Sequence, residues 1–213
     1  MPVKSIRSIY NKLYAYFGPQ DWWPADTPFE VMVGVILTQS TSWSNVEKAI
    51  KNLKEYNALN PHKLISLSNI KLARLIRSAG YYNIKAGRLK AFLKFFIGKY
   101  DADIKKISRR DHSSLREELL GVKGIGPESA DSILLYALGK PVFVIDAYTK
   151  RILLRHHLIK KDATYDDLQG LFTDNLKREV KLFNEYHALI VRLGKEFCLK
   201  SKPRCYLCPL RLI

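Results

Sequence analysis

The sequence predicts an all-α protein, and three observations support this fold class. Apolar residues recur at the three- and four-residue spacing of a helix face along most of the chain. The one run with strand-like composition, residues 142–145, is short enough to be an extended connector. A glycine-rich turn at residues 121–126 separates two helical segments, and Pro127 follows it where a first helical residue is expected. We therefore expect helices joined by short loops.

Composition and charge favour a globular protein with a polyanionic partner. The 213 residues are 47% hydrophobic, which is enough for the core of one large domain or two small ones. No apolar run approaches the roughly 20 residues of a membrane span, so we expect a cytoplasmic, nucleoid-associated monomer with no membrane partner. Lysine and arginine total 36 against 20 acidic residues, giving a net charge of +16. The alternative readings of this charge are thermophile composition and solubility.

The N-terminal segment is expected to be a helix followed by an aromatic loop. Residues 4–17 carry apolar side chains on one helical face, and a Gly-Pro pair ends the pattern. Trp22 and Trp23 follow in a loop that Pro24 closes. Because two adjacent large aromatic side chains cannot both enter one core, we expect one of them to face a cleft.

A central buried helix is expected to begin after Thr27, which forms a capping box with Glu30. The apolar stripe of this helix runs directly into the polar stretch 38–43, which is too short to be a linker. One interpretation of this stretch is a binding surface beside a buried helix. The other is that it caps the next helix, with Ser44 and Glu47 as a second box.

Local sequence patterns predict the remaining elements of the chain. Asp146 precedes a helix with a basic face, which is usually a solvated surface. The five histidines show no metal-ligand spacing, and we assign them no chemistry. Further helices are expected near residues 46–53, 68–79, 89–97, 127–138, 165–171 and 185–197.

Three cysteines, Cys198, Cys205 and Cys208, are clustered near the C-terminus with gaps of six and two residues. We expect no export signal, and on that expectation clustered thiols favour metal binding over disulfides. Reduced structural cysteines are the alternative.

The motif Leu-x-Gly-Val-x-Gly-Ile-Gly-x-x-x-Ala, an apolar helix and a Val-x-Val-Ile-Asp run together resemble the helix-hairpin-helix of the endonuclease III superfamily of DNA glycosylases. The resemblance is strongest at residues 27–43, 80–86, 119–155 and 198–209. It implies two helical lobes with the active site in a cleft between them, and double-stranded damaged DNA as the partner. We expect a six-helix lobe at residues 20–138, and a second lobe built from residues 1–19 and 139–213.

The resemblance also implies roles for individual residues. In that family the hairpin amides hold a DNA phosphate, which here corresponds to Gly121, Val122, Lys123, Gly124, Ile125 and Gly126. Gln39 matches the residue that fills the gap left by an extruded base, Lys85 is expected to contact phosphate, and Asp146 matches the catalytic aspartate. Considered alone, Asp146 is an ordinary N-cap. The expected base pocket consists of Trp22, Trp23, Trp43, Glu128 and Tyr148.

The cysteine spacing resembles the Cys-x6-Cys-x2-Cys-x5-Cys pattern that holds a [4Fe–4S] cluster in endonuclease III relatives. Cys198, Cys205 and Cys208 match its first three positions, and the fourth would fall immediately after Ile213. A cluster is therefore expected, while zinc remains open because clusters normally use four thiolates.

Glu128 predicts the type of reaction. Bifunctional members of the family have a lysine at this position, whose amine attacks the sugar, and a carboxylate cannot do so. Glu128, the Trp-Trp-Pro loop and the Asp-x-Tyr at Asp146 resemble the 3-methyladenine glycosylase branch, in which tryptophan faces suit positively charged alkylated purines. A helix-dipole role is the structural alternative for Glu128. We expect a monofunctional glycosylase; the alternatives are a bifunctional glycosylase and AP lyase using Lys123, and a non-catalytic DNA-binding module.

Overall fold

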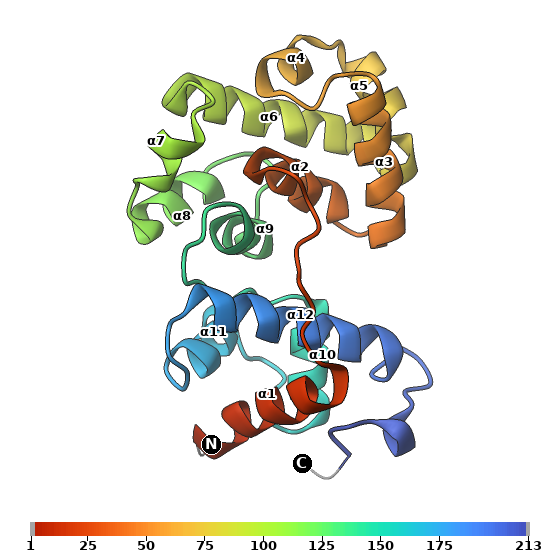
Figure 1. Cartoon of the computed structure of the whole chain (residues 1–213), viewed down its shortest axis with the longest axis vertical. Helices are drawn as coiled ribbons and strands as arrows, with labels where there is room; N and C mark the ends of the chain where they lie inside the picture. The colour runs from red at the N-terminus through yellow and green to blue at the C-terminus, as the bar shows by residue number, and fades with distance from the viewer. Residues whose placement is uncertain (1–2, 212–213) are drawn as a thin grey trace. The chain divides into compact units, whose positions relative to one another are not determined.

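The computed structural model describes residues 3–211, and over these residues the chain is helical without a β-strand (Figure 1). The chain divides into two compact units. The terminal unit comprises Met1–Pro24 and Pro141–Ile213, and the central unit comprises Ala25–Lys140. These boundaries lie a few residues beyond those expected from the sequence, so Trp22 and Trp23 belong to the terminal unit.

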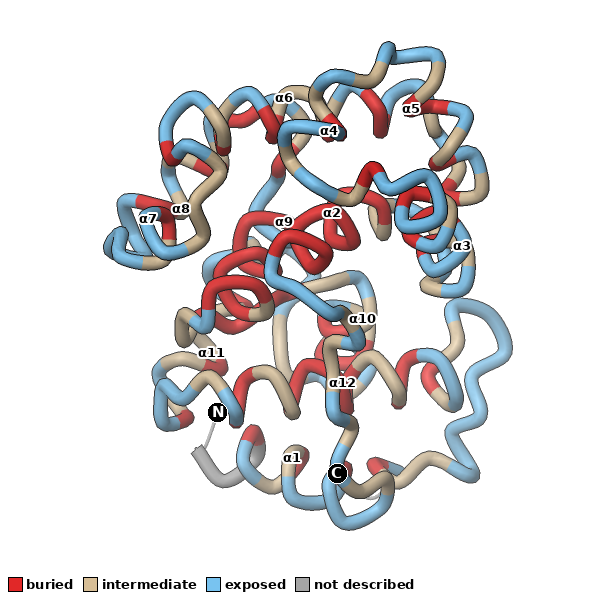
Figure 2. Tube along the Cα trace, turned by 45° about the horizontal axis from the view of Figure 1, so that its top comes forward, coloured by how far each residue is buried: buried red, intermediate tan, exposed pale blue. Residues whose placement is uncertain are grey.

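The central unit is built around α2 (Pro28–Thr38), in which every residue from Phe29 to Leu37 is buried. Figure 2 shows most of α2, and the end of α9 with the segment that follows it, as buried stretches within this unit. Helix α2 packs against α3, α6 and η2, which accounts for its nearly uncharged sequence. The other elements of the unit are α3 (Trp43–Glu55), α4 (Pro61–Ser66), α5 (Asn69–Leu75), η1 (Arg77–Ala79), α6 (Tyr82–Tyr100), α7 (Ile104–Ser108), α8 (His112–Leu120), α9 (Pro127–Ser132) and η2 (Ile133–Ala137).

The N-terminus of α2 confirms the predicted cap. Thr27 Oγ1 accepts a hydrogen bond of 3.1 Å from the Glu30 N–H. The Glu30 carboxylate accepts from the Asp26 N–H at 3.2 Å, one residue earlier than in an ordinary capping box, and also pairs with Lys54 at 2.7 Å. These bonds satisfy a buried carboxylate and fix the start of the central helix.

Helices α8 and α9 are joined by the glycine hairpin and locked by an ion pair. Arg116 on α8 donates to both carboxylate oxygens of Asp131, at 2.7 and 3.2 Å, and the Asp131 side chain is fully buried. After α9 the chain widens into a π-helical turn, in which the Leu138 N–H bonds the Ile133 carbonyl at 3.2 Å. The sequence predicts an uninterrupted α-helix here, and we have no physical account of the wider turn.

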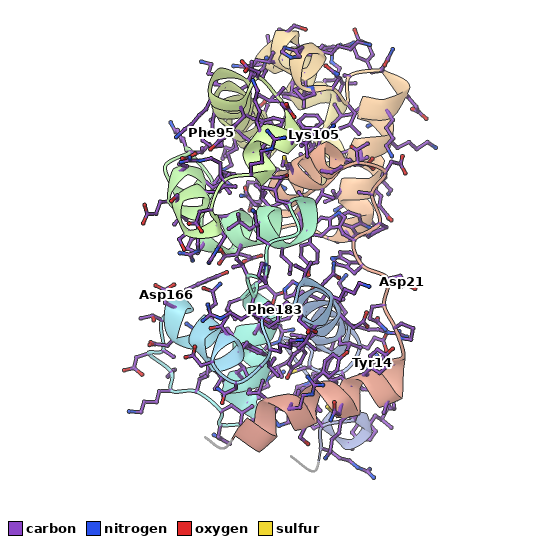
Figure 3. The ribbon with its side chains drawn as sticks, turned by 60° about the vertical axis from the view of Figure 1, so that its left-hand side comes forward. Tyr14, Asp21, Phe95, Lys105, Asp166 and Phe183 are labelled. Carbon is purple, nitrogen blue, oxygen red and sulfur yellow. The ribbon has the colours of Figure 1, made fainter. Side chains whose placement is uncertain are left out.

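The terminal unit packs α12 (Val180–Glu196) against α1 (Val3–Phe17) and α10 (Ala147–Arg155). Tyr14 on α1 and Phe183 on α12 mark two of these helices in Figure 3. The Tyr186 hydroxyl on α12 donates to the Ile6 carbonyl at 2.8 Å, which ties the first helix to the C-terminal third. Helix α11 (Tyr165–Thr173) and the turn η3 (Cys205–Leu207) complete the unit.

Residues 141–146 form the extended connector that the sequence predicts. Its apolar side chains are buried, and the Phe143 ring stacks on Phe172 with 3.8 Å between ring centroids. Among the described residues no helix combines the length and apolar character that crossing a membrane requires.

Candidate nucleic-acid interface and active site

The glycine hairpin leaves some of its backbone donors open. Within the turn, hydrogen bonds of 3.0 to 3.1 Å to neighbouring carbonyls use the N–H groups of Gly121, Val122 and Ile125. Among the described residues, no acceptor is present for the N–H groups of Lys123, Gly124 and Gly126. The six-residue anion site expected from the sequence is therefore reduced to three donors. Adjacent open N–H groups in a turn form a concave anion-binding surface.

The hairpin residues whose N–H groups are used serve another purpose. The side chains of Val122 and Ile125 are buried and anchor the turn between α8 and α9. Gly124 has a φ of +90°, a conformation that favours glycine. The structure thus confirms the positive φ that the sequence predicts for glycine in this turn. It also reduces the predicted anion-binding donors from six N–H groups to three.

Gln39 directly follows α2 and lies against this hairpin. Its Nε2 donates to the Gly124 carbonyl at 3.0 Å and to Ser129 Oγ at 2.9 Å, while Arg88 Nη1 donates to its Oε1. The predicted gap-filling residue and the predicted phosphate site are thus in direct contact within the central unit. No feature of the sequence indicated the part played by Arg88.

Trp43 begins α3, and its Nε1 donates to Glu47 Oε1 at 2.8 Å. The alternative capping box of Ser44 and Glu47 is wrong, because Ser44 lies inside α3 and the N-cap is Ser42, which makes no side-chain capping bond. Ser42 bonds the Ser44 hydroxyl at 3.0 Å instead.

Glu128 is exposed in the first turn of α9, where its charge suits the helix dipole.

Lys85 does not lie where the resemblance implies. The residue is 1% exposed, and its Nζ donates to the Leu37 carbonyl at 2.8 Å and to the Ala79 carbonyl at 2.7 Å. Burial lowers its pKa to about 8, and the charge of Arg88 adds to this effect. The expectation of a phosphate contact is corrected accordingly: Lys85 joins the end of α2 to the turn before α6.

Asp146 is the N-cap of α10, as its sequence context alone suggests. Its Oδ1 accepts from the Thr149 N–H at 2.7 Å and from the Thr149 hydroxyl at 2.8 Å. Its Oδ2 lies 3.6 Å from His187 Nε2, and the Asp146 side chain is 10% exposed. One oxygen thus starts the helix, while the other faces a histidine.

The surroundings of Asp146 keep it ionised. Burial opposes the charged form and by itself raises the pKa, but the interactions with His187 and Thr149 outweigh it, and the pKa lies below its ordinary value of 3.8. His187 on α12 was assigned no chemistry from the sequence. His187 lies 41 positions after Asp146, no sequence pattern links the two, and the packing of α10 on α12 brings them together.

The remaining expected pocket residues are divided between the two units. Trp43 and Glu128 lie in the central unit, and Trp22, Trp23 and Tyr148 lie in the terminal unit. The tryptophan loop, marked by Asp21 in Figure 3, is held to α12 by a 2.9 Å bond from the Gln20 N–H to Glu185.

Within the terminal unit, the aromatic side chains contact residues of α10 and α12. Lys195 Nζ lies 5.9 Å from the centroid of the Trp22 ring. Tyr148 packs so closely on Gly194 that a Cβ there would lie 2.3 Å from its ring, and Arg151 covers the same ring at 4.9 Å. Tyr148 therefore has an evident packing role in addition to the one expected.

The cysteine loop is held by two arginines of α10. Arg151 Nε donates to the Cys198 carbonyl at 2.8 Å, and Arg155 Nη1 donates to Cys198 Sγ at 3.2 Å. Burial raises the pKa of Cys208, and the charges of Cys198 and Cys205 raise it further. Among the described residues, no three His, Cys, Asp or Glu side chains form a metal-binding group. Three thiols do not complete the four-sulfur ligand set of a cluster.

Comparison with known proteins agrees with the resemblance seen in the sequence. Residues 33–178 match a family model described as HhH-GPD superfamily base excision DNA repair protein. The chain is 48% identical over 208 residues to a Methanocaldococcus jannaschii protein named as a DNA repair glycosylase, covering 97% of this chain and 94% of that protein. It is 29% identical over 187 residues to endonuclease III of Thermotoga maritima, covering 86% and 81% of the two chains. Among solved structures, 3-methyladenine DNA glycosylase of H. pylori bound to 1,N6-ethenoadenine matches with a TM-score of 0.77 and 29% identity over 92% and 98% of the two chains.

Proposed function

Because the chain belongs to the HhH-GPD superfamily of base excision DNA repair proteins, we propose that it is a monofunctional glycosylase that removes alkylated purines from double-stranded DNA. Family membership establishes the coarser statement, a DNA glycosylase of base excision repair. Our proposal goes further in three respects: the lesion that is removed, the monofunctional reaction and the residues that carry it out. The observation that carries it is the largely buried Asp146 carboxylate, kept ionised beside His187.

DNA binding would begin at the hairpin. The N–H groups of Lys123, Gly124 and Gly126 are suited to one backbone phosphate, because all three are open and the exposed Lys123 adds a charge beside them. The net charge of +16 supports sequence-independent attraction to DNA. An excising enzyme must also extrude the base from the stack, and Gln39 would fill the resulting gap.

Bond cleavage would rely on Asp146. Loss of a base leaves positive charge on the sugar, as in glycoside hydrolysis, and an ionised carboxylate stabilises that charge. Asp146 Oδ1 is already bonded to Thr149, so Oδ2 is the oxygen suited to face the sugar. His187 Nε2, 3.6 Å from Oδ2, supports the ionised state before the substrate arrives. Attack by water would then complete hydrolysis.

The absence of a family-type lysine at Glu128 supports hydrolysis without strand cleavage. The competing proposal is a bifunctional enzyme that uses Lys123, and similarity to the Thermotoga maritima endonuclease III supports it. Lys123 is exposed on the hairpin, where a phosphate contact is an adequate reason for its charge.

The preference for alkylated purines is supported by the aromatic residues and by one relative. Trp22 already has a lysine ammonium 5.9 Å from its ring centroid, which is cation–π geometry. An alkylated purine with positive charge would gain about 0.5 to 2 kcal/mol over such a ring compared with a neutral base. The H. pylori relative was solved with a modified adenine.

We also propose an iron–sulfur cluster on Cys198, Cys205 and Cys208. The spacing of the three cysteines supports it, while the incomplete ligand set opposes it. No step of base removal depends on this group.

The proposal is tested by one panel of duplexes that carry an alkylated purine, 8-oxoguanine or uracil at the same position. We expect release of the alkylated purine, with the abasic strand cut only after alkali or heat. Addition of borohydride should trap no covalent complex. Trapping, or cutting without alkali, would favour the Lys123-dependent alternative, and binding without release of any base would favour a non-catalytic module.

A further inference from the structure

The side chain of Gln39 is fully engaged in the protein without DNA. Its two N–H donors are directed at the Gly124 carbonyl at 3.0 Å and at Ser129 Oγ at 2.9 Å. Its Oε1 accepts from Arg88. A glutamine that enters a DNA stack needs these same donors and acceptors for an unpaired base, so it must exchange at least part of this arrangement.

The chemistry of the partners fixes the orientation of the amide. The Gly124 carbonyl can only accept a hydrogen bond, and an arginine guanidinium can only donate. Nε2 must therefore face the hairpin, and Oε1 must face Arg88. Without Arg88, Oε1 loses its partner, and only the bonds from Nε2 to the Gly124 carbonyl and Ser129 hold the side chain.

Arg88 also contacts the hairpin directly. A Cβ on Gly124 would lie 2.3 Å from Arg88 Cγ and 2.7 Å from Cδ, so the stem of Arg88 lies flat on this glycine. Arg88 comes from α6, one turn after the buried Lys85, which bonds the Leu37 carbonyl two residues before Gln39. Helix α6 thus holds both the backbone before Gln39 and its side chain.

We propose that Arg88 is a positioning residue for Gln39: it stores the side chain against the hairpin with its amide oriented, and acts on excision through Gln39. This proposal rests on the proposed function, in which Gln39 enters the gap in the DNA. It explains why one side chain contacts both the predicted phosphate-binding turn and the predicted gap-filling residue. Binding of a phosphate at the hairpin then occurs at the same turn from which Gln39 is released.

The competing role for Arg88 is a simpler one, in which the guanidinium binds a DNA phosphate as an isolated cation. The two roles differ in one measurable respect. A positioning role disappears when Gln39 is removed, whereas a phosphate contact adds its effect to that of any change at Gln39.

The test is a double-mutant cycle on single-turnover excision from an alkylated-purine duplex, with wild type, Gln39→Ala, Arg88→Met and the double variant. Arg88→Met keeps an apolar stem over Gly124 and removes the donors. We expect each single variant to lose about tenfold in rate, as for loss of a hydrogen bond to a charged group, and the double variant to be no slower than Gln39→Ala. Lys94→Met, which removes an exposed charge from the same helix, is the control and should retain most of the activity.

A second readout separates positioning from a general effect on folding. A duplex with 2-aminopurine opposite an abasic analogue reports entry of a side chain into the gap, without any base removal. We expect the fluorescence change to be lost in Gln39→Ala, reduced in Arg88→Met and partly restored in Arg88→Lys, at unchanged thermal stability.

The outcomes distinguish this inference from the function on which it rests. If Gln39→Ala excises normally and gives the wild-type fluorescence change, the gap-filling role fails and the inference fails with it. If Gln39→Ala is impaired but Arg88→Met is not, or if the two losses multiply in the double variant, the function stands and the positioning role is overturned.

Discussion

His187 Nε2 on α12 lies 3.6 Å from Asp146 Oδ2 at the start of α10, and both side chains are about one-tenth exposed. The contact joins a carboxylate that local sequence identifies as a helix cap to a histidine that no motif identifies. The two oxygens of Asp146 therefore have different partners. Thr149 holds the oxygen that starts the helix, and His187 faces the other.

Replacing His187 by Phe should lower the excision rate about tenfold, the effect of a change of about one pKa unit in the interaction between the imidazole and the Asp146 carboxylate 3.6 Å away. Without His187, less of the pKa increase that burial causes at Asp146 is offset, so the pKa of Asp146 should rise. The acidic limb of the pH–rate profile should therefore move to higher pH. His187→Gln, which keeps a donor at a similar distance, is the matched control. Equal activity and equal profiles for Phe and Gln would show that His187 only fills space.

The ionised state of Asp146 should also appear in the pH dependence of folding. Because its folded-state pKa is lowered, its charge stabilises the fold above its ordinary pKa of 3.8, and this contribution is lost as pH falls through the lower folded value. Asp146→Asn preserves the cap and removes the charge. Urea unfolding should therefore give a wild-type advantage at pH 5 that shrinks toward pH 3, and a constant difference would contradict the assignment.

Gly124→Ala should weaken DNA binding by an order of magnitude or more and lower thermal stability. The new methyl group meets the stem of Arg88 at 2.3 Å, in a backbone with φ of +90° that alanine avoids. Gly98→Ala, in α6 with no atom within 4 Å of the added Cβ, should bind DNA normally and be slightly more stable. Fluorescence anisotropy on undamaged duplex checks both, and normal binding by Gly124→Ala would exclude the hairpin as the phosphate site.

If the cysteine loop holds an iron–sulfur cluster, protein purified without oxygen should be brown, with a broad absorption near about 400 nm typical of thiolate-bound iron. Cys208→Ser should lose most of the iron, because it removes one of only three sulfurs in the set. Iron analysis and the visible spectrum provide the measurement. A colourless, iron-free protein would leave the cysteines as reduced structural residues.

Local features were predicted most reliably from the sequence. The N-cap at Thr27, the helix start after Asp146 and the glycine turn depend on residues a few positions apart, which a sequence displays directly. The prediction for Lys85 was wrong because a lysine is expected at the surface. Here the carbonyls of Leu37 and Ala79, at the ends of two helices, accept hydrogen bonds from its ammonium and hold it inside the core.

Contacts between distant segments explain what the sequence did not reveal. Arg88 reaches Gln39 across 49 residues, and His187 reaches Asp146 across 41, and neither pair has a characteristic spacing. Such pairs are set by the packing of helices, which periodicity alone does not specify. They are also the residues that most sharpen the proposed mechanism.

The central claim is that the charge of Asp146 drives hydrolysis of the N-glycosidic bond. The most direct test is single-turnover excision of an alkylated purine by wild type and Asp146→Asn, with DNA affinity measured on the same duplex. We predict a loss of about 10² to 10⁴ in rate at unchanged affinity, and an intact abasic strand in the wild-type reaction. Full activity of Asp146→Asn would contradict the catalytic role, and strand cleavage by wild type without alkali would contradict the monofunctional reaction.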